Sequence, residues 1–333
     1  MNKVTIKDVA REAGVSISTV SNALNNVDLL LPKTKEHILQ VAEKLNYIPN
    51  QNGRNLKAKE AMAVGLFISA LRGVYYGVLS DTLHAECRKL EYDLYIYIIN
   101  QCRNITANVL GRRVDGAIIL YEKTTEETLT KLKKSRSPVV FLDRELDDET
   151  ISSVVFDSFR FGELAANYLI SLGHRNIVHV SGISGNYDSE ERRRGFMHAL
   201  RNASLDLPPE NIIEGFFEEE AASRELKRYL RSGHPIPDAI FASNDLSAIG
   251  CMEALREEGA RVPEDVSVIG CDDIDISKMM IPALTTIHTN FEKQGVIAME
   301  LLMDMMKKGK SGAIKKISGE LVIRKSCMRR IAD

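Results

Sequence analysis

Short polar side chains recur at helical spacing near the N-terminus. Ser18, Asn22 and Asn25 lie four and three residues apart, so on a helix they share one face. Hydroxyl and amide groups can reach base edges in the DNA major groove, and an asparagine can bond adenine through both of its polar atoms. An exposed face built only for solubility would more often carry Glu and Lys. The spacing favours a DNA-reading helix, whereas the plainer interpretation makes these residues cap and turn formers.

Three short helices are expected to position this strip. Thr5 can cap a first helix, with Asp8 in the capping-box position, and Gly14 can end that helix in the left-handed conformation. Ser16 can cap the second helix, which carries the polar strip. A third amphipathic helix is expected over 32–45. Two helices joined by a short glycine turn form the helix-turn-helix pattern.

Charge is distributed unevenly along the chain. Residues 1–60 hold nine basic and six acidic side chains, a net charge of +3, whereas the whole chain has a net charge of −2. A basic head on an acidic body suggests an anionic partner for the head alone.

Composition excludes several protein classes. The chain has 333 residues and is 44% hydrophobic, enough for two or three buried cores. It lacks an apolar run of the roughly 20 residues that a spanning helix requires, and its first residues lack the apolar segment of a secretion signal. The five cysteines are scattered, without a Cys-x-x-Cys pair. We therefore expect a cytoplasmic protein with reduced thiols, no metal site and no cofactor.

Residues after the head alternate between strand-like and helix-like segments. Strands are expected at 64–69, 94–100, 116–121, 139–143, 154–157, 177–181, 239–243 and 266–270. Helices are expected at 75–90, 126–134, 162–172, 191–201, 222–230 and 246–257. This alternation, with continuous apolar strands, predicts parallel sheets covered on both faces, and about 270 residues suit two lobes better than one.

Polar residues at strand ends are candidate ligand contacts, because doubly wound sheets bind ligands there. Asp143 ends one expected strand, Asn244 and Asp272 follow two others, and Arg192 opens an expected helix. Carboxylate, amide and guanidinium groups can bond the hydroxyls of a sugar. Plainer roles are also open: Arg192 can pair with the two glutamates before it, and Asp272 can cap a turn.

Two N-terminal phrases carry a family resemblance. VTIKDVAREAGVSISTVSNALN, from Val4 to Asn25, and LNYIPN, from Leu45 to Asn50, resemble the LacI/GalR family of bacterial transcription regulators. Segments 243–245, 261–270 and 282–287 resemble effector-domain phrases of the same family. The resemblance implies an N-terminal all-α helix-turn-helix head, followed by an α/β two-lobed, periplasmic-binding-protein-like (type I) effector domain with a ligand cleft between its lobes.

The resemblance also implies roles for residues of the head. Its second helix enters the major groove, where Ile17, Ser18 and Asn22 read bases. The matching phosphate-contacting positions are Thr5, Ser16, Thr19, Asn25, Tyr47 and Asn50. Arg54 and Leu56 match a hinge segment that enters the minor groove, where the leucine wedges between base pairs. Relatives often carry Arg in place of Asn22 and Ala in place of Gly53, so base preference and hinge-helix stability are expected to differ here.

For the effector cleft, the resemblance implies contacts from Asp143, Arg192, Asn244 and Asp272. The resemblance also implies that the aromatic side chains of Tyr75, Phe156 and Phe217 lie at the cleft. Phe217 can equally be a core residue. Relatives often read Asn-Pro-Phe-Phe where this chain reads Gly73-Val74-Tyr75-Tyr76, so the identity of the ligand is left open.

The expected domain organisation follows. Residues 1–48 form the helix-turn-helix domain and 49–60 the hinge or linker. Residues 61–333 form the effector-binding and dimerisation domain. Its N-terminal lobe covers about 61–157 and 289–318, and its C-terminal lobe about 158–288 and 319–331.

The sequence predicts a DNA-binding transcriptional regulator, most simply a repressor, controlled by a small sugar-like effector. Its expected partners are double-stranded operator DNA, the effector and a second copy of the chain, as a dimer or higher assembly. A protein co-effector is the main alternative, and a solute-binding protein is disfavoured by the helix-turn-helix and the absent signal. An enzyme is disfavoured because the chain has neither His-Glu-x-x-His nor Gly-x-Gly-x-x-Gly.

Overall fold

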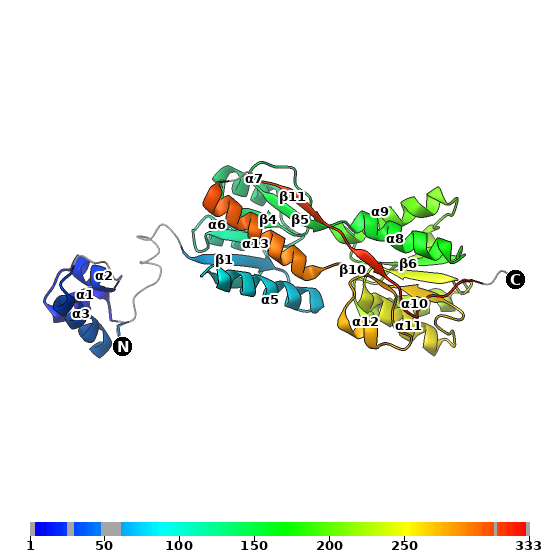
Figure 1. The fold of residues 1–333 in the computed structure, drawn as a ribbon, viewed down its shortest axis with the longest axis horizontal. Coiled ribbons are helices and arrows are strands. Elements are labelled where there is room, and N and C mark those ends of the chain that lie inside the picture. The colour runs from blue at the N-terminus through cyan, green and yellow to red at the C-terminus, as the bar shows by residue number, and fades with distance from the viewer. Residues whose placement is uncertain (1–3, 25–29, 48–60, 310–311, 331–333) are drawn as a thin grey trace. The chain divides into compact units, whose positions relative to one another are not determined.

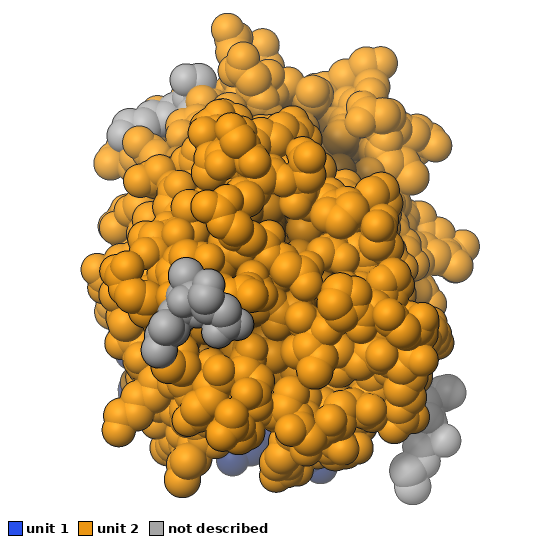
Figure 2. Space-filling view, turned by 90° about the vertical axis from the view of Figure 1, so that its right-hand side faces the viewer, with its two compact units in different colours: residues 1–61 blue, residues 62–333 orange. Residues whose placement is uncertain are grey.

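The computed structural model describes residues 4–24, 30–47, 61–309 and 312–330. The chain divides into two compact units, residues 1–61 and residues 62–333, which carry different colours in Figure 2. Within the described ranges, no helix combines the length and the apolar character needed to cross a membrane.

The described residues of the smaller unit form helices α1 (Ile6–Ala13), α2 (Ile17–Leu24) and α3 (Pro32–Lys44). Thr5 and Asp8 form a capping box at the start of α1, and Gly14 ends that helix with a φ of 66°. The Ser16 hydroxyl accepts a hydrogen bond from the Thr19 backbone N–H at 3.1 Å, as a residue capping α2 would. The predicted helices and caps of the head are thus confirmed.

Small and branched apolar side chains hold these helices together. Val9, Val20, Ala23 and Ile38 have no exposed surface and form one cluster shared by the three helices. Because α1 packs on both α2 and α3, the orientation of α2 is fixed and one of its faces stays outside the core.

The larger unit begins with a parallel six-stranded sheet in the order β11-β5-β4-β3-β1-β2. Its strands are β1 (Ala63–Ile68), β2 (Asp93–Ile98), β3 (Gly116–Leu120), β4 (Val139–Phe141), β5 (Ser152–Phe156) and β11 (Ile314–Ile317). Helices α5 (Val74–Lys89), α6 (Arg103–Val109), α7 (Glu126–Ser135) and α13 (Phe291–Lys308) accompany it. Helix α13 packs against α5 and contacts β3, β4 and β5. We call this part lobe 1.

A second parallel sheet, in the order β7-β6-β8-β9, organises lobe 2. Its strands are β6 (Ile177–Ser181), β7 (Ile212–Glu214), β8 (Ala239–Ala242) and β9 (Ser267–Ile269). A 3-10 turn, Pro209–Asn211, precedes β7, and the helices are α8 (Ser158–Ser171), α9 (Tyr187–Asn202), α10 (Glu219–Arg231), α11 (Asp245–Glu257) and α12 (Asp275–Met279). The predicted two-lobed α/β architecture is confirmed.

Three segments connect the lobes: the step from β5 to α8, the step from β10 (Thr286–His288) to α13, and the step from β11 to β12 (Glu320–Val322). Strands β10 and β12 pair with each other in an antiparallel two-stranded sheet. Figure 1 shows these strands running between the two larger sheets. Because the connections are short, the lobes can move relative to each other only about this narrow region.

Two local expectations need correction. Helix α9 begins at Tyr187 rather than near residue 191, because the Asn186 side chain caps it by accepting the Ser189 N–H at 3.0 Å. Arg192 therefore lies in the second turn of α9 and does not open it. Strand β2 is not covered on both faces: it is the edge strand of its sheet, and Ile98 is 59% exposed.

Candidate DNA-reading helix and interlobe site

The first turn of α2 presents a cluster of small hydroxyl groups to solvent. The Ser16 hydroxyl lies 2.7 Å from the hydroxyls of both Ser18 and Thr19. Ser18 is exposed and Ile17 is 45% exposed, whereas Asn22 is half-buried. No carboxylate occupies this first turn, so the partial positive charge of the helix N-terminus is unopposed there.

The predicted phosphate-contacting residues are spread around the head. Thr5 is exposed, and its hydroxyl donates to Asp8 at 2.7 Å. Tyr47 is half-buried against the three-helix core. The remaining predicted DNA contacts lie outside the described residues: Asn25, Asn50, Arg54 and Leu56. Gly53 lies outside them as well.

Arg192 is buried in lobe 2, with 4% of its surface exposed. The two preceding glutamates pair with other arginines, Glu190 with Arg193 and Glu191 with Arg194. The interpretation that Arg192 pairs with these glutamates on a solvated helix face is therefore wrong.

The Arg192 guanidinium keeps its charge in this buried position. One of its terminal nitrogens, Nη1, donates to the Ser243 carbonyl oxygen at 2.5 Å. Burial alone would lower the pKa of Arg192, but the neighbouring Cys271, Asp188 and Asp272 raise it. Its Nε is buried without a hydrogen-bond partner among the described residues. A bound acceptor would therefore relieve an unsatisfied donor.

Asp188 precedes Arg192 by one helical turn of α9. Its carboxylate accepts a hydrogen bond from the Ser158 hydroxyl at 2.5 Å, at the start of α8. Burial raises the pKa of Asp188 and Glu122 adds to this, while Arg192 opposes it. The sequence reasoning missed Asp188, although a carboxylate four residues before a candidate arginine is a recognisable signal.

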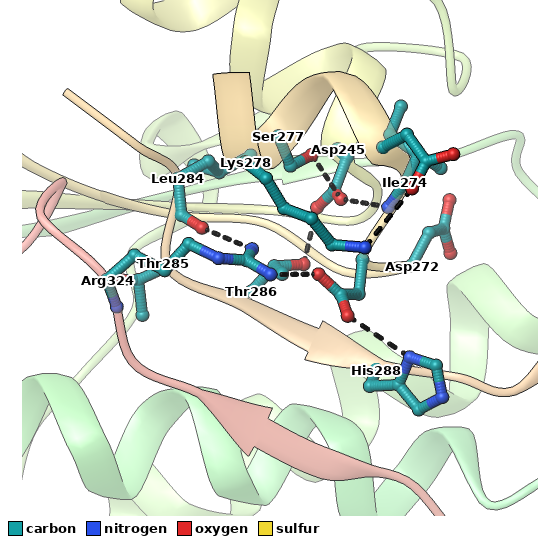
Figure 3. Close-up of polar contacts among 12 residues, drawn as sticks. Asp245, Asp272, Ile274, Ser277, Lys278, Leu284, Thr285, Thr286, His288 and Arg324 are labelled. Atoms are coloured by element: carbon teal, nitrogen blue, oxygen red, sulfur yellow. Dashed lines mark hydrogen bonds and ion pairs between the residues drawn. The ribbon is translucent and has the colours of Figure 1, made fainter. Parts of the chain in front are cut away.

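Asp272 lies in a strained loop after β9. Its φ is 134° and that of Asp273 is 61°, both in the region that favours glycine. Burial raises the pKa of Asp272 well above its ordinary value, whereas the nearby Arg192 opposes this. Figure 3 shows the Asp272 carboxylate apart from the network of bonds around it, so the loop is held by other groups.

Those other groups centre on Asp245, a buried residue at the start of α11 that the sequence reasoning also missed. Its carboxylate accepts from the Ile274 N–H at 3.0 Å, the Ser277 hydroxyl at 2.6 Å and the Thr286 hydroxyl at 2.5 Å. These bonds join α11 and the Asp272 loop to the interlobe strand β10, as Figure 3 shows. Asp245 is thus a local anchor for the loop.

Asn244 and Phe217 contact each other in lobe 2. The Asn244 side chain caps α11 by accepting the Ser247 N–H at 2.9 Å, and it donates to the Phe217 carbonyl oxygen at 3.1 Å. The Phe217 ring lies over Gly182, where an added Cβ would be 2.1 Å from the ring. Phe217 is half-buried, so it is not a closed core residue.

Asp143 is the polar group that lobe 1 places after β4. It is 5% exposed and pairs with Arg144 at 3.2 Å. Burial raises the pKa of Asp143, which Arg144 opposes. Arg144 also donates to three backbone carbonyls, those of Tyr121, Glu122 and Thr124, which fixes its position.

Tyr75, on α5, is the aromatic residue that lobe 1 contributes, and its contacts are with other residues of lobe 1. Its hydroxyl donates to Gln294 at 2.6 Å, and its ring contacts Phe291 and Phe156 with centroid separations of 4.9 and 6.1 Å. Phe156 is 2% exposed and supports Tyr75 from within the core. Burial raises the pKa of Tyr75, and the charges of Asp188 and Asp143 raise it further. Tyr75 therefore lies near acidic groups of both lobes.

We take these residues together as a candidate interlobe site: Tyr75 and Asp143 from lobe 1, and Asp188, Arg192 and Asp272 from lobe 2. Parallel sheets present the carboxyl ends of their strands at one edge, which explains why loops after β4, β6 and β9 contribute. The site offers hydrogen-bond donors, acceptors and an aromatic face. Among the described residues, no group of three or more His, Cys, Asp or Glu side chains is arranged to hold a metal ion.

Comparison with known proteins identifies the family. Residues 5–50 match bacterial regulatory proteins of the lacI family, and residues 166–327 match the periplasmic binding protein-like domain. The chain is 33% identical to a probable HTH-type transcriptional repressor ExuR of Bacillus subtilis, over 98% of this chain and 99% of that protein. This chain belongs to the lacI family. It is also 33% identical to the HTH-type transcriptional repressor PurR of Pasteurella multocida, over 98% and 99% of the two chains.

Solved structures of lacI-family proteins share the whole fold. A lac repressor dimer bound to operator and the anti-inducer ONPF superposes with a TM-score of 0.79 at 26% identity, covering 98% of this chain and all of that one. A complex of the regulator CelR with cellobiose gives 0.73 at 25% identity, covering 97% and 100%. The predicted family and fold class are confirmed, and the protein is a transcription regulator rather than an enzyme.

Proposed function

We propose that this lacI-family protein is a sequence-specific DNA-binding repressor whose operator affinity is controlled by a small molecule bound between its lobes. The observation that carries the proposal is the full-length likeness to a repressor bound to operator. Two of its relatives are named as transcriptional repressors, which supports repression rather than activation.

In this proposal, α2 enters the major groove with its N-terminal turn. Ile17 and Ser18 are exposed there, and Asn22 follows one turn later. Thr5, Ser16, Thr19 and Tyr47 contact phosphates, which set the register of the helix without reading sequence. Asn25, Asn50, Arg54 and Leu56 keep their proposed backbone and minor-groove roles. Phosphate neutralisation makes the affinity strongly dependent on salt.

The proposed effector is sugar-like and binds at the interlobe site. Asp143, Asp188 and Asp272 supply acceptors, and Arg192 supplies an unsatisfied donor. Sugar hydroxyls both donate and accept, so they match this mixture. We propose that Tyr75 and Phe217 pack on the ligand, with Phe156 behind Tyr75, and that Asn244 places Phe217. Regulators of the same fold were solved with cellobiose and with ribose.

The proposed active species is a homodimer. Each head then binds one half-site of a near-palindromic operator. Lobe 1 exposes Tyr95, Ile96 and Ile98 on the edge strand β2, and lobe 2 exposes Met279 and Ile281 beside a hollow of about 620 Å³. Exposed apolar groups of this kind mark association surfaces.

Selection of binding sites from random DNA tests the proposal with the full chain. Asn22→Ala is expected to relax base preference at one position of each half-site, because one bidentate contact discriminates by about 1–3 kcal/mol. Lys134→Ala, on α7 of lobe 1, is the control and should select the wild-type site. If the wild-type chain selects no sequence in the presence or absence of sugars and nucleobases, the proposed function is wrong.

A further inference from the structure

Two contacts join the lobes outside the interlobe site, at the start of α9. The side-chain amide of Asn186 donates to the Glu122 carboxylate. The Tyr187 hydroxyl donates to the Glu145 carboxylate at 3.0 Å. Asn186 and Tyr187 belong to lobe 2, whereas Glu122 follows β3 and Glu145 follows β4 in lobe 1. We call these two pairs the interlobe clasp.

Asn186 has a fixed orientation in the clasp. Its side-chain oxygen accepts the Ser189 N–H at 3.0 Å, which caps α9. Because the side-chain oxygen bonds the helix, the NH₂ group of the same amide points away from the helix and donates to the Glu122 carboxylate. Capping and lobe contact thus use opposite ends of one side chain.

The second pair is reinforced from lobe 1. Lys316, on β11, pairs with the Glu145 carboxylate at 2.8 Å. The Lys316 hydrogen bond, followed by that of Tyr187, lowers the pKa of Glu145 despite some burial. Burial and the Glu145 charge raise the pKa of Tyr187, so the tyrosine keeps its proton and acts as the donor. Glu191 and Arg194 of α9 also face this carboxylate.

The clasp acts directly on the residues proposed to bind the effector. Asp188 follows Tyr187 in the chain, and Arg192 lies one turn further along the same helix. Fixing the start of α9 to lobe 1 therefore sets how closely these two residues approach Tyr75 and Asp143. All four clasp residues are at least partly exposed, so the clasp can open without leaving a buried group unpaired.

We propose that Asn186 and Tyr187 are positioning residues that, through Glu122 and Glu145, hold the lobes together before any effector binds. This role rests on the proposed function, in which the effector binds between the same two lobes. Each clasp bond shifts the balance between closed and separated lobes by about twofold to tenfold, the range of a net hydrogen bond.

Distances between spin labels in the effector-free full chain test the proposal. Labels are placed on Lys134→Cys of lobe 1 and Ser184→Cys of lobe 2, after the partly exposed Cys102 and Cys327 are replaced with serine. Labelled chain is mixed with excess unlabelled chain, so that distances within one protomer dominate. Tyr187→Phe and Asn186→Asp are each expected to move population toward longer distances, because Asp still caps a helix but cannot donate to Glu122.

A reciprocal exchange separates positioning from a general structural effect. In Asn186→Asp/Glu122→Gln the donor and acceptor change places, so the wild-type distance distribution should return. Tyr168→Phe is the matched control, because the Tyr168 hydroxyl has no hydrogen bond to any residue that the structure describes, and it should leave the distribution unchanged. Unchanged distances in both single variants, or failure of the exchange to restore closure, overturns the proposal. Operator binding is measured separately by gel shift. If the chain binds operator while the distances stay unchanged, the clasp is wrong and the proposed function still holds.

Discussion

At the scale of single residues, the interlobe site depends on Arg192, which must keep its positive charge although it is buried away from water. A buried charge is tolerated only when it is paired and hydrogen-bonded. Arg192 donates to the Ser243 carbonyl, and the charges of Asp188 and Asp272 favour its ionised form, yet its Nε is still unsatisfied. The site is therefore stable enough to fold while retaining a donor for a ligand.

His179 gives the molecule a predictable response to acid. Its ring packs against the rings of Phe196 and Phe241, which also contact each other, and its Nδ1 lies 3.0 Å from the Phe241 carbonyl oxygen. Burial lowers the pKa of His179 from 6.5 to about 4. Between these values the unfolded chain binds a proton that the folded chain does not. Stability is thus full above pH 6.5 and falls by about 3 kcal/mol as pH drops toward 4.

Urea denaturation at a series of pH values checks this prediction. His179→Phe keeps a ring in the stack and removes the titrating group, so its loss of stability between pH 6.5 and 4 should be smaller than that of wild type. His84→Gln, at an exposed position of α5, is the control. Identical pH profiles for His179→Phe and wild type would contradict the assignment.

The residues that sequence reasoning found and missed differ in a physical way. Asp143 and Arg192 could be proposed because strand ends and a family match mark their positions. Gln294 was missed because its hydrogen-bond partners are distant in the sequence. It donates to the Val154 carbonyl at 2.8 Å and accepts from the Tyr75 hydroxyl. Asp245 adjoins a recognised residue, but its partners lie 29 to 41 residues away in the chain.

At the scale of elements, a close crossing of α8 and α9 places Arg192. A Cβ added at Gly162 would lie 2.0 Å from the Arg192 carbonyl oxygen, and one added at Gly195 would lie 1.9 Å from the Phe159 carbonyl oxygen. Each helix therefore needs a glycine where the other passes. Phe161 and Phe196, on the two helices, are fully buried beside this crossing.

Gly195→Ala is expected to lower the free energy of unfolding by about 1–3 kcal/mol, because the helices must separate to admit the methyl group. Gly77→Ala is the matched control in α5, where an added Cβ meets nothing within 4 Å. It should raise stability by about 0.5–1 kcal/mol, since alanine loses less backbone freedom in a helix. Equal effects of the two substitutions in urea denaturation would show that the crossing is not tight.

Element prediction succeeded where the local pattern was long and failed where pairing partners decide the outcome. The strand expected at 177–181 agrees with β6 at both ends. The short strands β7, β10, β11 and β12 have three or four residues each and were not predicted. Strand β11 contains two exposed lysines, and it exists because it pairs with β5 at the sheet edge. Such strands are set by tertiary pairing rather than by their own composition.

At the scale of the whole molecule, apolar surface is exposed on both lobes. Ile98 on β2 is 59% exposed, and Ile281, after α12, is 96% exposed. A monomer gains nothing by exposing such groups to water, whereas the proposed dimer would bury them. Two linked heads also bind a two-site operator more tightly than separate heads, because the second contact becomes intramolecular.

Ile98→Asp and Ile281→Asp test this arrangement. A carboxylate buried in the proposed interface without a partner should raise the dimer dissociation constant more than about tenfold, the equivalent of 1.4 kcal/mol. Operator affinity should fall with it. Monomer stability should change by less than about 0.5 kcal/mol, because both residues are exposed in the single chain. Sedimentation measures the assembly and gel shift the affinity, with Ile236→Asp as control at another exposed isoleucine. If both interface variants sediment like wild type, these faces do not form the dimer, and the two heads must be joined through another surface.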